Sequence, residues 1–285
     1  MWNRQLFRFQ HLAMKLLCFS IFIVAVSCKD VLDCIQKTSG DKKLRIGGPD
    51  ACEVKPHSKP WIVRLSESFD KTMSICGGTL IAENAVLTAK HCGVFKGNYA
   101  ILGDHDENDF DNGEMSIKVA NVISDLPGCL KCDFAIVILE EKVQLNKNIQ
   151  IASLPSPDEE IPSGKVLVSC GWGQDFFNKT RETDKLWCVA QEVTLNSKCP
   201  LIIPFIEEYF LCTTDPDDRR NSPCHGDSGG PLTYTDENGK TTLFGVVSGA
   251  GSMEHDCNGT EVFSRVSNPN VLNWIKTNLD NISLL

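Results

Sequence analysis

A single serine stands between an acidic residue and two glycines in CHGDSGGPL, the segment from Cys224 to Leu232. A serine that attacks a carbonyl carbon needs a base, a group that orients the base, and donors for the developing oxyanion. Gly226 permits a tight turn, so the amide hydrogens of Gly226 and Ser228 can converge as an oxyanion hole. The segment therefore predicts acyl-transfer chemistry, provided that the rest of the chain supplies a base and its partner.

Two other segments can supply these groups. LTAKHC places His91 beside Cys92 at the end of an apolar strand, and KCDFAIVILE places Asp133 at the start of an apolar run that should be largely buried. A buried carboxylate is unfavourable unless it is paired, and a protonated histidine is a suitable partner. We therefore expect Ser228 to attack, His91 to take and return the proton, and Asp133 to hold the imidazole tautomer.

Short β-branched runs, separated by Gly, Pro, Asn and Asp, must position these residues. They are WIVRL, AVLTA, SIKVANVI, FAIVIL, KVLVS, LFGVVSG and EVFSRV. This rhythm is typical of an all-β sandwich or barrel rather than of alternating strands and helices. Near the C-terminus, NVLNWIKTNL spaces its apolar side chains as a helix does, so we expect an α-helix over Asn270–Leu279 that packs on the β-structure.

The N-terminus predicts secretion. Arg4, Arg8 and Lys15 precede an apolar run that ends in small residues at Ser27 and is shorter than the roughly 20 residues of a spanning helix. We expect a signal peptide over residues 1–27, a leader over 28–45 and the main domain over 46–285. The protein would then be extracellular, and would be attached to a membrane only if the signal stays on the chain as an anchor.

Charge and cysteine content narrow the class of protein. The 285 residues carry a formal charge of −9, and removal of the three basic residues of the signal gives −9 − 3 = −12. Nucleic acids and anionic membranes prefer basic faces, so neither is expected as a partner. Fourteen cysteines in a secreted chain indicate disulfides rather than a metal site.

TAKHC, DFAIVIL and GDSGGP, in this order, resemble the motifs of the chymotrypsin-like, or trypsin-family, secreted serine endopeptidases. The resemblance extends from about Arg45 to the C-terminal helix. It implies two six-stranded antiparallel β-barrels with the site in the cleft between them, and a zymogen that cuts protein or peptide substrates through an acyl-enzyme. No cofactor is required, and we expect a monomer. The alternative is a catalytically silent homologue that acts as a binding or cofactor protein, although no triad residue is substituted here.

The resemblance assigns a role to LRIGG. An activating protease would cut after Arg45, and the new α-ammonium of Ile46 would pair with Asp227, which orders the oxyanion hole and the specificity pocket. Gly47 stands where the family usually has a second β-branched residue. The alternative is a basic linker that is cut incidentally.

Disulfide pairs also follow from the resemblance. It implies four bridges: Cys52–Cys188, Cys76–Cys92, Cys199–Cys212 and Cys224–Cys257. The last of these, Cys224–Cys257, would brace the pocket wall. The pairing of five cysteines stays open, namely Cys28, Cys34, Cys129, Cys132 and Cys170. A bridge from Cys34 to one of the last three would tether the leader to the domain.

The acidic loop GDHDENDFDNGE resembles the calcium loop of the family. Asp104, Asp111 and Glu114 stand where that loop supplies side-chain oxygens, and Asp106 and Asp109 where it supplies carbonyls. A hard cation would relieve the repulsion between these carboxylates, so one structural calcium ion is expected here. The alternative is a solvated acidic loop without a metal ion.

Three positions stand where the family has its specificity pocket. Ser222 is at the floor, and by itself favours an apolar P1 side chain. Glu261 replaces the usual wall glycine, and Ala250 replaces another. A glutamate there can bind a basic P1 residue or fill the pocket for small ones. We favour basic P1, because a buried unpaired carboxylate is costly.

Three acceptor sequences for N-glycosylation occur in the chain, in agreement with secretion. Their asparagines are Asn178, Asn258 and Asn281.

Overall fold

The computed structural model describes residues 51–283, except for 72, 110–112, 130, 158, 176–177, 183, 200–203, 217–220, 251–256 and 258–259. The expected signal, leader and cleavage point at Arg45 and Ile46 lie outside the described residues, as do Asp111 and Asn258. None of the helices in this part of the chain is both long enough and apolar enough to cross a membrane.

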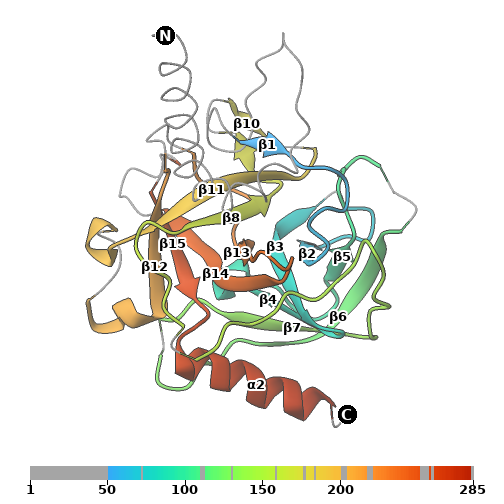
Figure 1. Ribbon diagram of the computed structural model, residues 1–285. Helices are drawn as coiled ribbons and strands as arrows, with labels where there is room; N and C mark the ends of the chain where they lie inside the picture. Colours follow the sequence, from blue (N-terminus) through green and yellow to red (C-terminus); the bar gives the residue numbers. More distant parts are fainter. Residues whose placement is uncertain are drawn as a thin grey trace, which may run out of the picture.

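The N-terminal half forms a closed barrel of six antiparallel strands in the order β2-β3-β4-β7-β6-β5 (Figure 1). The strands are β2 (Ile62–Ser66), β3 (Ser74–Ala82), β4 (Ala85–Thr88), β5 (Tyr99–Leu102), β6 (Met115–Ile123) and β7 (Ala135–Leu139). A short 3-10 helix, η1 (Lys90–Cys92), follows β4. β4 pairs with β7 so that Thr88 lies opposite Ala135. The segments after β4 and before β7 therefore lie at the same end of the barrel.

The C-terminal half forms a second closed barrel, because β8 pairs with both β11 and β13. Its strands are β8 (Val166–Gly171), β11 (Trp187–Thr194), β12 (Phe210–Thr214), β13 (Pro231–Thr235), β14 (Thr241–Ala250) and β15 (Thr260–Arg265). β1 (Cys52–Glu53) adds to β11, and β9 (Gln174–Asp175) pairs with β10 (Asn178–Glu182). Two further 3-10 helices are η2 (Asn196–Lys198) and η3 (Pro204–Tyr209).

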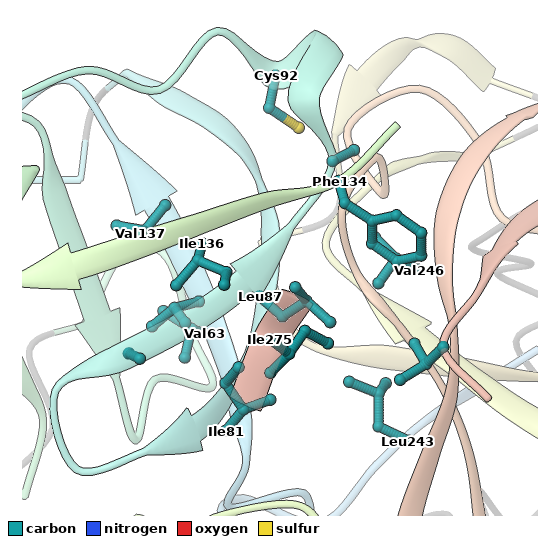
Figure 2. Packing of buried hydrophobic residues seen from close by; sticks show 14 of the residues in the cluster. Val63, Ile81, Leu87, Cys92, Phe134, Ile136, Val137, Leu243, Val246 and Ile275 are labelled. Carbon is teal, nitrogen blue, oxygen red and sulfur yellow. The ribbon is translucent and has the colours of Figure 1, made fainter. Parts of the chain in front are cut away.

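The C-terminal helix α2 (Pro269–Ser283) packs against the barrels and is longer than the sequence predicts. Asn268 caps it, since its side-chain oxygen accepts hydrogen bonds from the N–H groups of Asn270 and Val271 at 2.9 and 3.4 Å. Ile275 is fully buried in the main core cluster, which includes side chains of both barrels (Figure 2). One continuous core therefore holds the two barrels and the helix together, and the expected two-barrel fold is confirmed.

Five disulfides link described cysteines. Three match the implied pairs, and two come from cysteines whose pairing was open: Cys76–Cys92, Cys199–Cys212, Cys224–Cys257, Cys129–Cys132 and Cys170–Cys188. The prediction of Cys52–Cys188 is wrong. Cys188 on β11 lies opposite Cys52 of β1 and also opposite Cys170 of β8, and its sulfur bonds Cys170. Cys52 is disulfide-bonded to another partner. A tether from Cys34 to Cys129, Cys132 or Cys170 is excluded for the same reason, because those three are bonded elsewhere.

Candidate active site

The loops after β4 and before β7 bring His91 and Asp133 into contact. His91 Nδ1 lies 2.6 Å from Asp133 Oδ2, and the His91 backbone N–H donates to Asp133 Oδ1 at 2.8 Å. The Ser248 hydroxyl from β14 also donates to Asp133 Oδ2, at 2.7 Å. The carboxylate thus fixes the imidazole twice, through ring and backbone, which leaves Nε2 as the ring atom that can exchange a proton.

This contact shifts both pKa values. The hydrogen bond to Asp133 raises the pKa of His91, although partial burial opposes the effect. Burial alone would raise the pKa of Asp133, but the hydrogen bonds from His91 and Ser248 outweigh it and hold that pKa below its ordinary value. The pair therefore favours a charged imidazole beside an ionised carboxylate, which is what a general base needs after it accepts a proton.

The turn that carries Ser228 packs directly on the first barrel. The Gly77 N–H of β3 donates to the Ser228 carbonyl at 2.8 Å. A Cβ on Gly229, whose φ is +75°, would lie 2.1 Å from Thr88 Oγ1 and 3.1 Å from the Ala89 nitrogen. Only glycine allows this approach. Since Thr88 and Ala89 immediately precede the η1 helix that carries His91, the Ser228 turn is held beside His91.

Two backbone donors at this turn are open. The N–H groups of Gly226 and Ser228 make no hydrogen bond to any described residue, whereas their neighbours Asp227, Gly229 and Gly230 each donate one within the fold. Gly226 adopts φ +96°, a left-handed conformation that favours glycine. Two unsatisfied N–H groups on one turn can stabilise an oxyanion.

Asp227 is almost fully buried and braces this turn from beneath. Its carboxylate accepts hydrogen bonds from the N–H of Gly173 and of Cys224, each at 2.8 Å. A Cβ on Gly173 would come within 2.5 Å of that carboxylate. Gly173 therefore lets the backbone close over Asp227, whose side chain links this glycine to Cys224 at the start of the turn.

Two of the residues expected around the specificity pocket, Ser222 and Glu261, are buried. Ser222 has no exposed surface, and Glu261 on β15 is 3% exposed. Burial, together with the negative charge of Asp227, raises the pKa of Glu261 well above its ordinary value. Glu261 makes no side-chain hydrogen bond or ion pair with a described residue. Ala250 lies opposite Glu261 in the β14–β15 ladder.

A buried polar network fixes the strand segments next to Ser222. The Gln191 side-chain amide donates to the Asn221 carbonyl at 2.7 Å, and Thr213 Oγ1 donates to Gln191 Oε1 at 2.7 Å. Asn221 in turn donates from its backbone and its side chain to Asp215, at 3.0 Å each. Because Thr213 pairs with Glu261 across β12–β15 and Asn221 precedes Ser222, the network reaches the backbone next to two of the three expected pocket residues.

A lysine lies within the acidic loop expected to bind calcium. The Lys71 ammonium contacts Asp104 and Glu114 and the backbone carbonyls of Asp106 and Asp109. Elsewhere in the described chain, one group of metal-type side chains is close together, Cys76, His91 and Cys92, but its two sulfurs are joined in a disulfide and cannot both bind a metal ion. Of the glycosylation asparagines, Asn281 is exposed on α2 and Asn178 lies in β10.

Comparison with known families now decides what this constellation belongs to. The family model described as Trypsin matches residues 50–275. The chain belongs to the trypsin family. As a member of this family it is a serine endopeptidase, and the family acts on protein substrates.

Individual relatives agree with this assignment. The trypsin-family chain is 32% identical to chymotrypsin-C of Bos taurus over 82% of its length and 88% of the relative's. It is 31% identical to mast cell protease 3 of Ovis aries, over 84% of this chain and 90% of that one. It is also 30% identical to ovochymase-2 of Mus musculus over 69% of this chain, but the match spans only 34% of that longer protein.

Several residues of this trypsin-family site could not be found from the sequence. Ser248 gives no local signal, since it contacts Asp133 across a separation of 115 residues in the chain. Lys71, whose ammonium lies within the acidic loop, likewise stands in a segment with no metal-binding pattern. The Cys129–Cys132 bridge next to Asp133 could have been suspected, because two cysteines three residues apart are close enough to bond.

Proposed function

We propose that this chain is a secreted serine endopeptidase in which Ser228 is the nucleophile, His91 the general base and Asp133 its orienter. The observation that carries the proposal is the 2.6 Å contact from His91 to Asp133, next to a Ser228 turn with two open N–H donors. As Ser228 Oγ bonds the substrate carbonyl carbon, its proton passes to His91 Nε2. The carbonyl oxygen becomes an anion, which the N–H groups of Gly226 and Ser228 stabilise.

The same residues complete the reaction. The protonated His91 donates to the leaving amine as the C–N bond breaks, and Ser228 is left as an ester with the acyl group. A water molecule then attacks the ester, gives its proton to His91, and Ser228 leaves with that proton. Asp133 stays ionised throughout and stabilises the imidazolium at both stages.

Labelling by a fluorophosphonate probe after cleavage at Arg45 tests this proposal. The wild type should be labelled, and Ser228→Ala should not. Ser156→Ala is a matched control, because Ser156 is an exposed serine elsewhere on the surface and its loss should leave labelling intact. If cleaved and folded wild type is not labelled, the alternative follows, that the chain is a catalytically silent homologue with a binding role.

Activation by cleavage after Arg45 forms part of the proposal. The buried Asp227 carboxylate supports it, since an α-ammonium at Ile46 would be a charged partner for the side chain that braces the turn. Secretion rests on residues 1–27, and N-terminal sequencing of the secreted protein would show whether they are removed. Retention of this segment would indicate a membrane anchor instead.

We also propose that Cys52 keeps the cleaved leader attached to the domain. Cys52 is disulfide-bonded, and the bridges among described residues use every other cysteine of the chain except Cys18, Cys28 and Cys34. Mass spectrometry of the cleaved protein should therefore find the leader under non-reducing conditions and lose it on reduction. Its loss without reductant would contradict this tether.

A basic P1 residue is the substrate preference that Glu261 supports. Glu261 is buried without an ion pair to a described residue, so a lysine or arginine side chain at P1 would favour its ionisation. A peptide library scanned at P1 should show cleavage after Lys and Arg, and Glu261→Gly should lose that preference. Equal profiles for the two proteins would show that Glu261 does not contact P1.

A further inference from the structure

The loop between β5 and β6 is organised around a side chain from a different loop. Lys71 belongs to the connection between β2 and β3 and is 2% exposed. Its Nζ lies 3.1 Å from Asp104 Oδ1, 2.9 Å from the Asp109 carbonyl and 3.5 Å from the Asp106 carbonyl. It also forms an ion pair with Glu114. The ammonium thus contacts four of the five residues to which the sequence assigns calcium binding, and the fifth, Asp111, lies outside the described residues.

The residues present do not fit a calcium ion. Calcium takes about six to eight oxygen ligands at roughly 2.3–2.6 Å and would need the same oxygens that Lys71 now contacts. The Nζ distances are those of ammonium hydrogen bonds, and a second cation within this cage would be repelled by the first. Calcium could enter only if Lys71 left, which would expose a fully buried side chain.

A second buried cation completes the charge balance. Arg64 on β2 forms ion pairs with the other oxygen of Asp104 and with Glu107. Two basic side chains therefore face Asp104, Glu107 and Glu114, for a formal sum of 2 − 3 = −1. The carboxylate repulsion that would call for a metal ion is already largely relieved by the chain itself.

The backbone at Lys71 is also arranged for this contact. Lys71 has φ +65°, a left-handed conformation that is uncommon for a residue other than glycine. The turn around it is held by the Glu67 N–H, which donates to the Met73 carbonyl at 2.9 Å, and by the Ser66 hydroxyl, which donates to the same carbonyl at 3.0 Å. The side chain consequently projects into the neighbouring loop rather than into solvent.

We propose that the Lys71 ammonium is the permanent structural cation of the acidic loop, and that the protein folds and remains stable without calcium. The inference goes beyond the proposed peptidase activity and does not depend on it, because its readout is stability. It makes the loop independent of calcium concentration and of chelators in whatever compartment the protein occupies.

Thermal unfolding in excess calcium chloride and in EDTA tests the proposal. The wild type should have the same Tm in both. Lys71→Gly empties the cage and suits the left-handed backbone, so in EDTA its Tm should fall by about 10 °C. Calcium should restore part of that loss, because Asp104, Glu114 and the two carbonyls then remain as ligands, whereas magnesium should not. Lys96→Gly, at an exposed turn, is the matched control and should show neither effect.

Calorimetric titration of the wild type with calcium keeps the test decisive if Lys71→Gly does not fold. We expect the wild type not to bind calcium with a Kd of about 1 mM or lower. Calcium binding by the wild type, a lower wild-type Tm in EDTA, or a folded Lys71→Gly with an unchanged Tm would each overturn the proposal.

Discussion

Two buried acidic regions of the protein differ in whether a buried cation of the described chain contacts their carboxylates. In the loop between β5 and β6, Lys71 contacts Asp104 and Glu114, and Arg64 contacts Asp104, although burial still raises the pKa of Glu114 to about 7. In the second barrel, Glu261 has no ion pair with a described residue, and burial together with the charge of Asp227 raises its pKa well above the ordinary value. The chain supplies its own cation where the charge supports the fold. Where the charge serves the reaction, we propose that the cation comes from activation and from the substrate.

Asp227→Asn gives the largest expected effect on this comparison. If the Ile46 ammonium orders the turn through the charge of Asp227, the neutral amide should lower kcat/KM by about three orders of magnitude while the protein is still secreted. Active-site titration and kinetics on cleaved protein would measure this. Near-normal turnover by the variant would contradict the activation scheme.

Arg64→Met tests the other region. It removes a buried cation but keeps an apolar side chain near the Trp172 ring, which lies 5.3 Å from the guanidinium. We expect the free energy of unfolding to fall by about 3–5 kcal/mol, because Asp104 loses one of its two partners. Urea denaturation would measure the loss, and folded protein should keep its kcat. A loss of kcat without a loss of stability would mean that Arg64 acts on the site.

Glu261→Gln should change how the stability of the protein depends on pH. The folded-state pKa of Glu261 is raised above its ordinary 4.5, so above that pH the native state binds more protons than the unfolded state. Its contribution to stability is therefore present at low pH and is lost as the pH rises. Relative to wild type, the variant should gain stability between pH 5 and pH 8, measured as the shift in urea midpoint. An unchanged difference would show that Glu261 ionises normally in the fold.

Ser248→Ala gives the smallest expected effect, because it removes only one hydrogen bond to the Asp133 carboxylate. In both proteins, activity should fall as the pH drops below the His91 pKa, because only the neutral imidazole accepts the Ser228 proton. Asp133 raises that pKa above its ordinary 6.5. Loss of the Ser248 hydrogen bond removes one of the contacts that lower the Asp133 pKa, and should reduce kcat/KM by only about threefold to tenfold. A pH profile of both proteins would measure it, and a loss of a thousandfold would make Ser248 essential rather than supporting.

Much of the fold could be predicted from local patterns. Each of the seven β-branched runs contributes residues to a strand, and the apolar spacing of 270–279 lies within α2. Several other strands were missed, and for β3 and β11 the physical reason is clear. β3 contains Gly77 and Gly78, which read as turn residues but allow other backbone and side chains to approach closely. β11 contains Gln191, a polar side chain that is buried because Asn221 and Thr213 bond it.

The candidate site divides in the same way. Motifs located His91, Asp133 and Ser228, because each of these residues must stand in a short, distinctive stretch to do its chemistry. The wrong Cys52–Cys188 pair came from the resemblance to the family. Cys188 lies opposite two cysteines, and which one bonds it depends on the contact between β8 and β11, strands that other segments separate in the chain.

The sequence by itself determined the family, the all-β class and the three residues proposed for catalysis, because these follow from residue types at short spacing. Only the tertiary structure decided which charges meet. Lys71 contacts Asp104 across 33 residues and Ser248 contacts Asp133 across 115, because strands far apart in the chain are neighbours in the fold. A buried charge is stabilised by whatever side chain lies next to it in space, and spacing along the chain carries no record of that neighbour.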